Sequence, residues 1–288
     1  MRIVVSGGTG FIGSFLVPAL ADEGHEVVAL ARRPEAAAVR EGVTVVSCDL
    51  TEPLRLPVET ADAVVHLAQA NVSLPEGARE LFAVNTAATH ELLDWARSHG
   101  AERFVLASSG SIYGLGDGVV DEDSPRRATD LYAVTKRCAE QLVESYAPHF
   151  AGTAVLRLFA PYGPTQTARL IPNLLQRVRE GLPVTLNDGG RPRLTPLFVE
   201  DVVRAFVAGL DLDGHSVVNV AGDEVVSIRE LALLIGEVLG RDPVFANGGA
   251  ADGDLIGDNR RMHELLGLEA LVPLEEGLRA TALAGAAA

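Results

Sequence analysis

Short apolar runs alternate with amphipathic stretches along the first half of the chain. The runs at residues 3–6, 27–31, 43–47, 63–67, 104–108 and 155–159 have the length and composition of buried strands. Helical periodicity falls between them, from about residue 11 to 22 and most clearly at residues 86–99 and 131–147. Continuous apolar strands separated by helices are typical of a parallel sheet covered on both faces. The pattern therefore predicts a doubly wound α/β fold.

The pattern changes after Pro164. Residues 170–180 read as a helix, and a stretch rich in glycine and proline follows. Residues 197–210 and 216–221 predict a return helix and a strand that rejoins the sheet. Ser227 and Glu230 form the spacing of a capping box at the start of a helix, and helices at 260–266 and 274–283 follow. We expect one domain from residues 1–164 plus about 197–221, and a smaller α/β lobe from about 165–196 plus 222–288.

Composition narrows the class of protein. The 288 residues are 48% hydrophobic, enough for one sizeable core and a smaller one beside it. A net charge of −15 argues against a nucleic-acid or anionic-membrane partner. Two cysteines cannot build a disulfide framework, no signal peptide is visible, and no apolar run reaches the ~20 residues of a membrane span. We expect a cytoplasmic protein.

The seven histidines show no metal-ligand spacing, so no metal is expected. His66 lies in an apolar run and is interpreted as a packed strand residue.

A glycine triad separates the first strand from the first helix. Gly7, Gly10 and Gly13 allow a tight turn, a close approach of backbone to a pyrophosphate, and close packing of helix on sheet. Phe11 and Ile12, which lie between Gly10 and Gly13, are also expected to contact the cofactor. The motif predicts a dinucleotide-binding Rossmann domain.

The end of the second strand indicates which dinucleotide binds. An acidic residue there would bind a ribose 2′-hydroxyl, whereas arginine accommodates a 2′-phosphate. Arg32 and Arg33 occupy this place, and Glu35 is the first carboxylate beyond them. The pair favours NADP(H); NAD(H) remains the alternative if the arginines are only solvated.

Two further strand ends complete the expected cofactor site. Asp49 would face the adenine amine, and small or polar residues after the fourth strand would let backbone line the cofactor. These expected contacts are Asp49, Leu50, Leu67, Ala68 and Gln69.

Lys136 is the only lysine of the chain, and it stands four residues after Tyr132. Four residues turn about 400° in a helix, so both side chains share one face. A tyrosine of pKa ~10 is a poor base at neutral pH. An ammonium ~4 Å away offers up to ~4 kcal/mol at an effective dielectric of 20. The sequence therefore predicts that Lys136 lowers the pKa of Tyr132 toward neutrality.

Ser109 lies where a parallel sheet opens its crevice to ligand. Tyr132 would exchange a proton with a substrate oxygen while hydride moves to or from nicotinamide, and Ser109 would hydrogen-bond the same oxygen. We interpret Ser109, Tyr132 and Lys136 as catalytic residues, with Tyr132 and Lys136 also contacting the cofactor. Ser111 is a candidate substrate contact.

The glycine triad, the serine and Tyr-x-x-x-Lys, in this order, resemble the extended short-chain dehydrogenases/reductases, specifically the NAD(P)-dependent epimerase/dehydratase family. The resemblance covers nearly the whole chain. It implies that Asn85 is a structural and cofactor-associated asparagine and that Phe159 borders the nicotinamide. It also implies nucleoside-diphosphate sugar substrates and a homodimer formed through the helices at residues 86–99 and 131–147.

The sequence departs from the family pattern at informative places. Gly110 and Ser111 stand where relatives that dehydrate sugars carry an acidic pair, so a dehydratase is rejected. Ala160 replaces an asparagine that touches the pyrophosphate in many epimerases, and Leu194 replaces the usual arginine. Arg193, beside it, is a candidate diphosphate contact, as is Arg169 at the mouth of the lobe. The alternative for both is a solvated loop charge.

We interpret the chain as an NADP(H)-dependent oxidoreductase acting at a sugar carbon, C4 being favoured. A 4-keto sugar reductase is preferred, because the arginine pair suggests NADPH and the shortened lobe is similar to reductases of nucleotide-activated 4-keto-6-deoxysugars. A nucleotide-sugar 4-epimerase, which returns its hydride to the same substrate, is the alternative. Other carbonyl substrates and a non-catalytic cofactor sensor are the remaining hypotheses.

Overall fold

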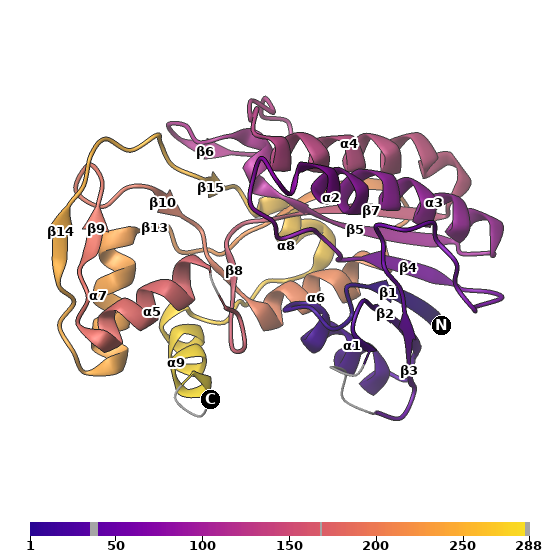
Figure 1. Cartoon of the computed structure of the whole chain (residues 1–288), viewed down its shortest axis with the longest axis horizontal. Coiled ribbons are helices and arrows are strands. Elements are labelled where there is room, and N and C mark those ends of the chain that lie inside the picture. The colour runs from indigo at the N-terminus through magenta and orange to yellow at the C-terminus, as the bar shows by residue number, and fades with distance from the viewer. Residues whose placement is uncertain (35–39, 168, 286–288) are drawn as a thin grey trace.

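In the computed structural model, a seven-stranded, wholly parallel sheet forms the centre of the larger part of the molecule (Figure 1). The structure describes residues 1–34, 40–167 and 169–285. The strand order is β12-β7-β5-β4-β1-β2-β3. The order reverses between β1 and β4, which is the doubly wound Rossmann arrangement. All seven expected strands are confirmed: β1 (Arg2–Ser6), β2 (Glu26–Ala31), β3 (Val43–Ser47), β4 (Ala63–His66), β5 (Arg103–Ser109), β7 (Gly152–Leu158) and β12 (Gly214–Val220).

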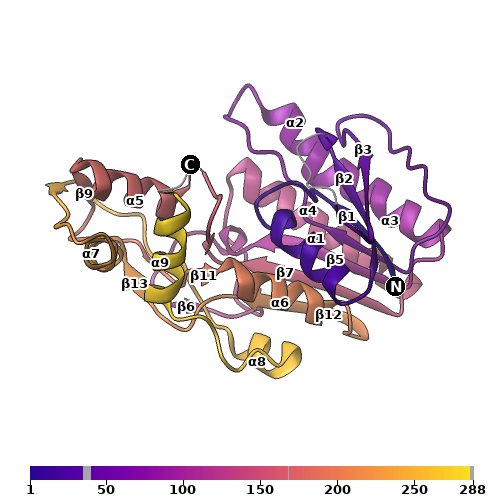
Figure 2. The ribbon, with the colours of Figure 1, turned by 90° about the horizontal axis from the view of Figure 1, so that it is seen from below.

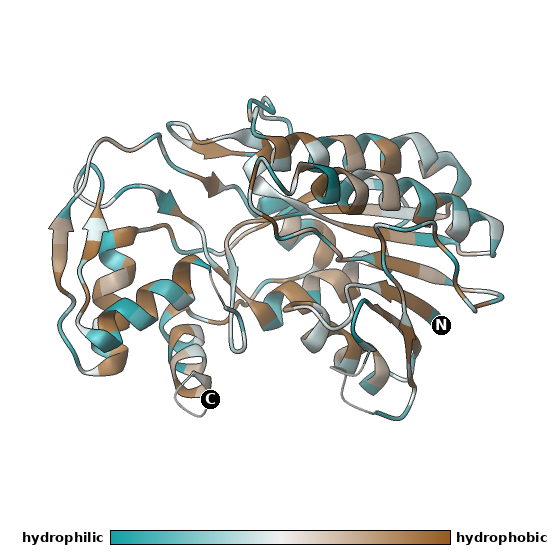
Figure 3. Ribbon diagram, viewed as in Figure 1, coloured by the Kyte–Doolittle hydropathy of each residue, from teal (hydrophilic) through white to brown (hydrophobic). Residues whose placement is uncertain are grey.

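Helices cover both faces of the sheet because alternate strand residues point to opposite sides. Ile3 and Val5 face one core, together with α1 (Gly13–Asp22), α6 (Val199–Gly209) and α8 (Arg260–Leu266). Val4 faces the other, beneath α3 (Ala88–Ser98) and α4 (Leu131–Tyr146). Figure 3 shows the strands largely brown between helices that carry polar turns. None of the described helices is both long and apolar enough for a membrane crossing.

A smaller lobe lies beside the sheet, on the left of Figure 1. Its separate core is built by α5 (Leu170–Glu180), α7 (Ile228–Leu239) and α9 (Leu274–Ala284). Ser227 and Glu230 form the expected capping box of α7. Two-stranded pairs link these helices: β9 (Val184–Leu186) with β14 (Phe245–Asn247), β10 (Arg193–Leu194) with β13 (Val226–Ser227), and β8 (Pro161–Tyr162) with β11 (Leu197–Phe198).

Short elements complete the chain. They are α2 (Ala78–Phe82), the π-helix η2 (Ala83–Ala87), the 3₁₀ turns η3 (Gly110–Tyr113) and η4 (Ala147–His149), and β6 (Val119–Val120) paired with β15 (Ile256–Gly257). The helix expected at residues 86–99 thus begins as a π-helix.

Helix α8 does not lie in the lobe, where the sequence placed it. The sequence places this helix in the lobe, but Met262 and Leu266 pack into the core of the sheet, next to α6 and β12 (Figure 2). The division into two domains stays a prediction.

Candidate active site

The glycine turn between β1 and α1 is closed by close backbone contacts. Gly7 has a φ of +70°, and a Cβ built on it would stand 2.9 Å from the Ala68 nitrogen. A Cβ on Gly13 would stand only 2.2 Å from the Gly7 oxygen. The Gly10 amide donates to the same oxygen at 2.9 Å. The expected tight turn and close helix packing are therefore present, at the carboxyl edge of the sheet where parallel folds bind ligands.

The side chains of Phe11 and Ile12 pack against other parts of the protein. Phe11 packs edge-on against Phe15 with the ring centres 6.1 Å apart and contacts the lobe core, while Ile12 packs against the sheet core. A cofactor contact from either residue would come from its backbone.

At the end of β2, Ala31 is buried and both Arg32 and Arg33 are exposed. Arg32 pairs with Glu80 of α2, Nη1 to Oε1 at 3.2 Å. Glu35 lies outside the described residues. The cofactor contacts expected of the two arginines stay predictions.

Asp49 and Asn85 each stabilise a turn of backbone near this edge. The Asp49 carboxylate accepts from the Thr51 amide at 2.9 Å and from the Thr51 hydroxyl at 2.8 Å, and these bonds lower the pKa of Asp49.

Asn85 is 1% exposed. Its Oδ1 accepts from the Ala70 amide, and its Nδ2 donates to the Thr135 hydroxyl, both at 3.1 Å. Asn85 therefore ties the segment after β4 to α4, in keeping with its expected structural role.

Ser109 and Tyr132 come together at the ends of β5 and α4. The Tyr132 hydroxyl donates to Gln69 Oε1 at 3.0 Å. The Ser109 hydroxyl is close enough to lower the pKa of the phenol by hydrogen bonding. Ser109 also donates to Ser111 Oγ at 2.9 Å and accepts from the Ser111 amide at 3.1 Å. Ser109, Ser111 and Tyr132 thus form a cluster of hydroxyl groups, and their contact with a substrate oxygen stays a prediction.

The Lys136 ammonium is bound to strand β5. It is buried and donates to the Ala107 carbonyl of β5 at 2.8 Å, and burial lowers its pKa to about 8. Burial raises the pKa of Tyr132, and the groups that lower it are Ser109 and Arg169. The predicted lowering of the phenol pKa by Lys136 is wrong for this structure, because desolvation dominates and the ammonium points to the strand.

Sequence reasoning missed a buried charge cluster beneath Lys136. Glu140 accepts from Arg157 through Nε at 3.0 Å and Nη2 at 2.8 Å, and from the Ser108 hydroxyl at 2.5 Å. Glu140 raises the pKa of Lys136 and so opposes the effect of burial. The signal in the sequence was the spacing of Glu140, four residues after Lys136 on the same helix face.

His66 is a packed strand residue, as expected. It is 1% exposed and its ring bonds the Ser6 hydroxyl at 2.6 Å and the Thr89 hydroxyl at 3.1 Å. Burial, with a smaller effect from Lys136, lowers its pKa to about 3, so the ring is neutral at physiological pH.

The two candidate substrate arginines lie in different surroundings. Arg169, the residue before α5, donates from Nη2 to Asn71 Oδ1 at 3.0 Å. Arg193 donates from Nε and Nη2 to the buried Asp254 at 2.9 and 2.8 Å, and Arg191 shares that carboxylate. These contacts hold the pKa of Asp254 well below its usual range. The charge of Arg193 is therefore already paired, whereas Arg169 bonds the neutral amide of Asn71.

Phe159 is enclosed by protein. Its ring is 1% exposed, stacks on Tyr113 with centroids 6.1 Å apart, and lies 2.7 Å from where a Cβ on Gly110 would stand. The expected contact with nicotinamide stays a prediction, and a side-chain contact would require the ring to move.

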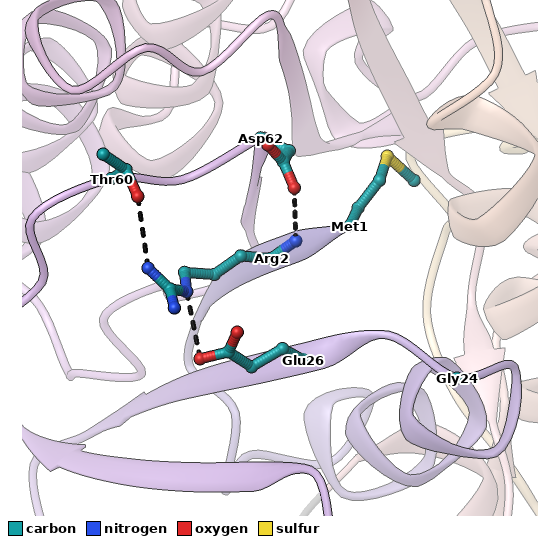
Figure 4. A pocket seen from close by; sticks show the side chains of 6 residues that line it. All are labelled: Met1, Arg2, Gly24, Glu26, Thr60 and Asp62. Carbon is teal, nitrogen blue, oxygen red and sulfur yellow. Dashed lines mark hydrogen bonds and ion pairs between the residues drawn. The ribbon is translucent and has the colours of Figure 1, made fainter.

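A depression of about 440 Å³ lies at the opposite, amino edge of the sheet (Figure 4). The Arg2 side chain lies in this depression. Its Nε forms an ion pair with Glu26 at 3.0 Å, and its Nη1 donates to the Thr60 hydroxyl at 3.1 Å. These contacts join β1, β2 and the loop before β4. The depression is lined by Met1, Arg2, Gly24, Glu26, Thr60 and Asp62, which offer no catalytic grouping. Over the described ranges, no three His, Cys, Asp or Glu side chains converge as metal ligands.

A Rossmann sheet with a glycine turn and a Ser-Tyr-Lys set at its carboxyl edge defines an extended short-chain dehydrogenase/reductase. The chain belongs to the NAD dependent epimerase/dehydratase family, whose model matches residues 3–221. It is therefore an enzyme of a family that acts on nucleotide sugars.

Three known proteins illustrate the range of relatives. The chain is 32% identical to a dTDP-4-dehydro-6-deoxy-D-allose reductase from a Streptomyces species, over 97% of this chain and 94% of the reductase. It is 30% identical to UDP-glucuronic acid decarboxylase 1 of Xenopus tropicalis, over 97% of this chain and 71% of the relative. The solved structure of MoeE5 in complex with UDP-glucuronic acid and NAD is 31% identical, with a TM-score of 0.87 and coverage of 100% and 99% of the two chains.

Proposed function

We propose that this enzyme uses NADP(H) to reduce the C4 carbonyl of a sugar linked to a nucleoside diphosphate. The observation that carries the reaction type is that Ser109 lies within hydrogen-bonding reach of Tyr132, whose hydroxyl bonds Gln69, the residue after the Ala68 backbone that packs on Gly7. The dinucleotide, when bound, supplies the hydride. Ser109 hydrogen-bonds the carbonyl oxygen, and Tyr132 donates its hydroxyl proton to that oxygen as it becomes an alcohol. Burial raises the pKa of the Tyr132 phenol, so the hydroxyl is protonated at neutral pH and has a proton to donate.

The direction of the reaction is supported by the end of β2. Arg32 and Arg33 are exposed there, and the strand ends on an alanine instead of a carboxylate. A 2′-phosphate bound at this strand end would be close to two guanidinium groups, although Arg32 already forms an ion pair with Glu80. The reductase from Streptomyces, which aligns over nearly its whole length, supports the same direction.

A nucleotide-sugar 4-epimerase is the second candidate. MoeE5 was solved in complex with UDP-glucuronic acid and NAD, which supports NAD as the cofactor in this alternative. The same serine and tyrosine would then first remove and later return a proton at the C4 oxygen. An epimerase would interconvert sugars without added reductant, whereas a reductase would consume NADPH in proportion to product.

The substrate would lie between the sheet edge and the lobe. Ser111 would contact the sugar, and Arg169, which bonds Asn71, would contact the diphosphate. Arg193 would reach the diphosphate only while sharing its charge with Asp254. We also propose that the helices α3 and α4 form a homodimer interface, which sedimentation velocity would test.

The test of the function is Tyr132→Phe, assayed with a nucleotide-linked 4-keto sugar and NADPH. We expect kcat to fall at least ~10²-fold, the usual size of an acid-base contribution, with the Kd for cofactor unchanged. Tyr146→Phe, at a half-buried position near the far end of α4, is the matched control. Undiminished turnover by Tyr132→Phe would reject the assignment.

A further inference from the structure

Strand β5 and helix α4 each carry one member of the Ser109–Tyr132 pair. Ser109 is the last residue of the strand, and Tyr132 is the second residue of the helix. Further along the helix, Glu140 Oε1 accepts from the Ser108 hydroxyl at 2.5 Å. Tyr132 and Glu140 are eight residues apart and therefore share one face of α4. The catalytic pair and the Ser108–Glu140 bond thus join the same helix face to consecutive residues of one strand.

Much of the remaining contact between α4 and β5 is apolar. Val143 of the helix and Phe104 and Leu106 of the strand belong to one core. Because side chains alternate along a strand, Ser108 continues the row of Phe104 and Leu106 on the face beneath α4. Apolar packing is non-directional and tolerates a small displacement of the helix along the strand. A hydrogen bond has a narrow range of length and angle, so the bond from Ser108 to Glu140 does not tolerate it.

The carboxylate of Glu140 is itself held by Arg157, the neighbour of Ser108 across the β5–β7 pair. Arg157 donates to Glu140 from Nε at 3.0 Å and from Nη2 at 2.8 Å. Its Nη1 donates to the Tyr113 hydroxyl at 2.6 Å, in the 3₁₀ turn that follows Ser109. Arg157, Glu140 and Ser108 are 0%, 6% and 3% exposed. A buried network whose members are bonded to one another in this way is rigid.

Lys136 adds a further contact between the two elements. Its ammonium donates to the Ala107 carbonyl at 2.8 Å. That ammonium ends a flexible four-carbon side chain, which can follow a small displacement of the helix. The carboxylate of Glu140, held by Arg157, is less adaptable. It is therefore the stronger constraint on the position of α4 along β5.

We propose that Ser108 and Glu140 are positioning residues that fix α4 along β5 and so place the Tyr132 hydroxyl against Ser109. The proposal rests on the proposed function in taking Ser109 and Tyr132 as the pair that serves the substrate oxygen. It applies equally to reduction and epimerisation. Misplacement of a catalytic group by about 1 Å can cost about 10²-fold in rate. A displacement of that size is less than the ~1.5 Å rise of one helical residue.

The first experiment is Ser108→Ala, in which Glu140 keeps both bonds from Arg157 and no buried charge loses its partner. The assay uses a nucleotide-linked 4-keto sugar and NADPH. We expect kcat to fall about 10-fold, with KM and the Kd for cofactor unchanged. Ser108→Thr, which keeps the hydroxyl, should restore most of the lost kcat. The matched control is Thr153→Val at the amino end of β7, which removes a buried hydroxyl bonded to His215 at 2.8 Å and should leave kcat unchanged.

A double-mutant cycle with Ser109→Ala separates positioning from an independent structural effect. If the Ser108 hydroxyl acts by placing Tyr132 against Ser109, its loss should matter little once the Ser109 hydroxyl is absent. We expect the factor lost in kcat on Ser108→Ala to shrink from about 10-fold to less than about 3-fold in the Ser109→Ala background. Equal factors in the two backgrounds would overturn the proposal, and so would equal losses of kcat in Ser108→Ala and Thr153→Val.

Crystal structures of the wild-type protein and Ser108→Ala give a measurement that does not depend on turnover. In the variant, α4 should lie displaced along β5. The separation of the Tyr132 and Ser109 hydroxyl oxygens should increase by roughly 0.5–1.5 Å, up to the rise of one helical residue. An unmoved helix would overturn the proposal whatever the value of kcat. Full activity of Tyr132→Phe would instead remove the proposed function, so the two failures are distinguishable.

Discussion

The guanidinium of Arg157 and the carboxylate of Glu140 form a two-bond ion pair in which the side chains are 0% and 6% exposed. Removing one partner leaves a buried charge uncompensated, which typically costs about 3–5 kcal/mol. We expect Glu140→Gln to lose stability of that order in urea unfolding.

The matched control is Glu275→Gln, which breaks the surface pair with Arg279 (56% and 57% exposed). It should cost at most about 1 kcal/mol. Equal losses in the two variants would contradict the importance of burial.

The neutral ring of His66 should make the protein less stable in acid. Its pKa is about 3 in the folded chain and 6.5 in the unfolded chain. Between pH 3 and 6.5 the His66 ring is therefore protonated in the unfolded chain but not in the folded chain. The free energy of unfolding consequently falls as pH drops from about 6.5 toward 3. The ring accounts for up to roughly 4–5 kcal/mol of this fall.

His66→Gln, which keeps hydrogen-bonding capacity but cannot titrate, should show a shallower acid limb in unfolding measurements from pH 7 to 4. His149→Gln, at an exposed position, is the control and should retain the wild-type slope. Identical slopes for all three proteins would show that His66 is already charged in the folded state.

A methyl group at Gly13 should disrupt the glycine turn. Its Cβ would meet the Gly7 oxygen at 2.2 Å, so helix α1 must move away from the turn. We expect Gly13→Ala to lose about 1–3 kcal/mol by overpacking and to bind cofactor at least ~10-fold more weakly. Gly249→Ala, where the added Cβ meets nothing within 4 Å, should leave both quantities unchanged. Calorimetric titration with dinucleotide measures the binding.

The proposed preference for NADP(H) requires that Arg32, now paired with Glu80, bind the 2′-phosphate. Loss of a charged hydrogen bond to a 2′-phosphate is worth about 1.5–3 kcal/mol, so Arg32→Ala should weaken NADPH binding by roughly 10- to 100-fold and leave NADH unaffected. Glu80→Gln frees the guanidinium and should strengthen NADPH binding. Fluorescence titration checks both, and equal Kd values for NADPH and NADH in the wild-type protein would refute the preference.

The strands, the principal helices and the glycine turn were predictable because their signals are local. A short apolar run indicates a buried strand whatever the order of the strands in the sheet. Tyr132 and Lys136 likewise share a face in any α-helix. The convergence of strand ends at one edge then follows from parallel connections alone. These features account for the outline of the fold and the position of the site.

Side-chain partners were not predictable in the same way. Lys136 has a strand carbonyl as its acceptor, Glu140 meets Arg157 seventeen residues away, and α8 covers the sheet although the chain around it builds the lobe.

What the sequence determined by itself is therefore the set of elements and the residue types delivered to the carboxyl edge. What only the tertiary structure decided is which charges pair there and which side chains lose water. Helix periodicity places Lys136 on the face of Tyr132, yet the effect of a charge depends on distance, direction and burial across the packed elements. In the folded chain the Lys136 ammonium is buried against the Ala107 carbonyl of β5, and Glu140 pairs with Arg157 from another strand.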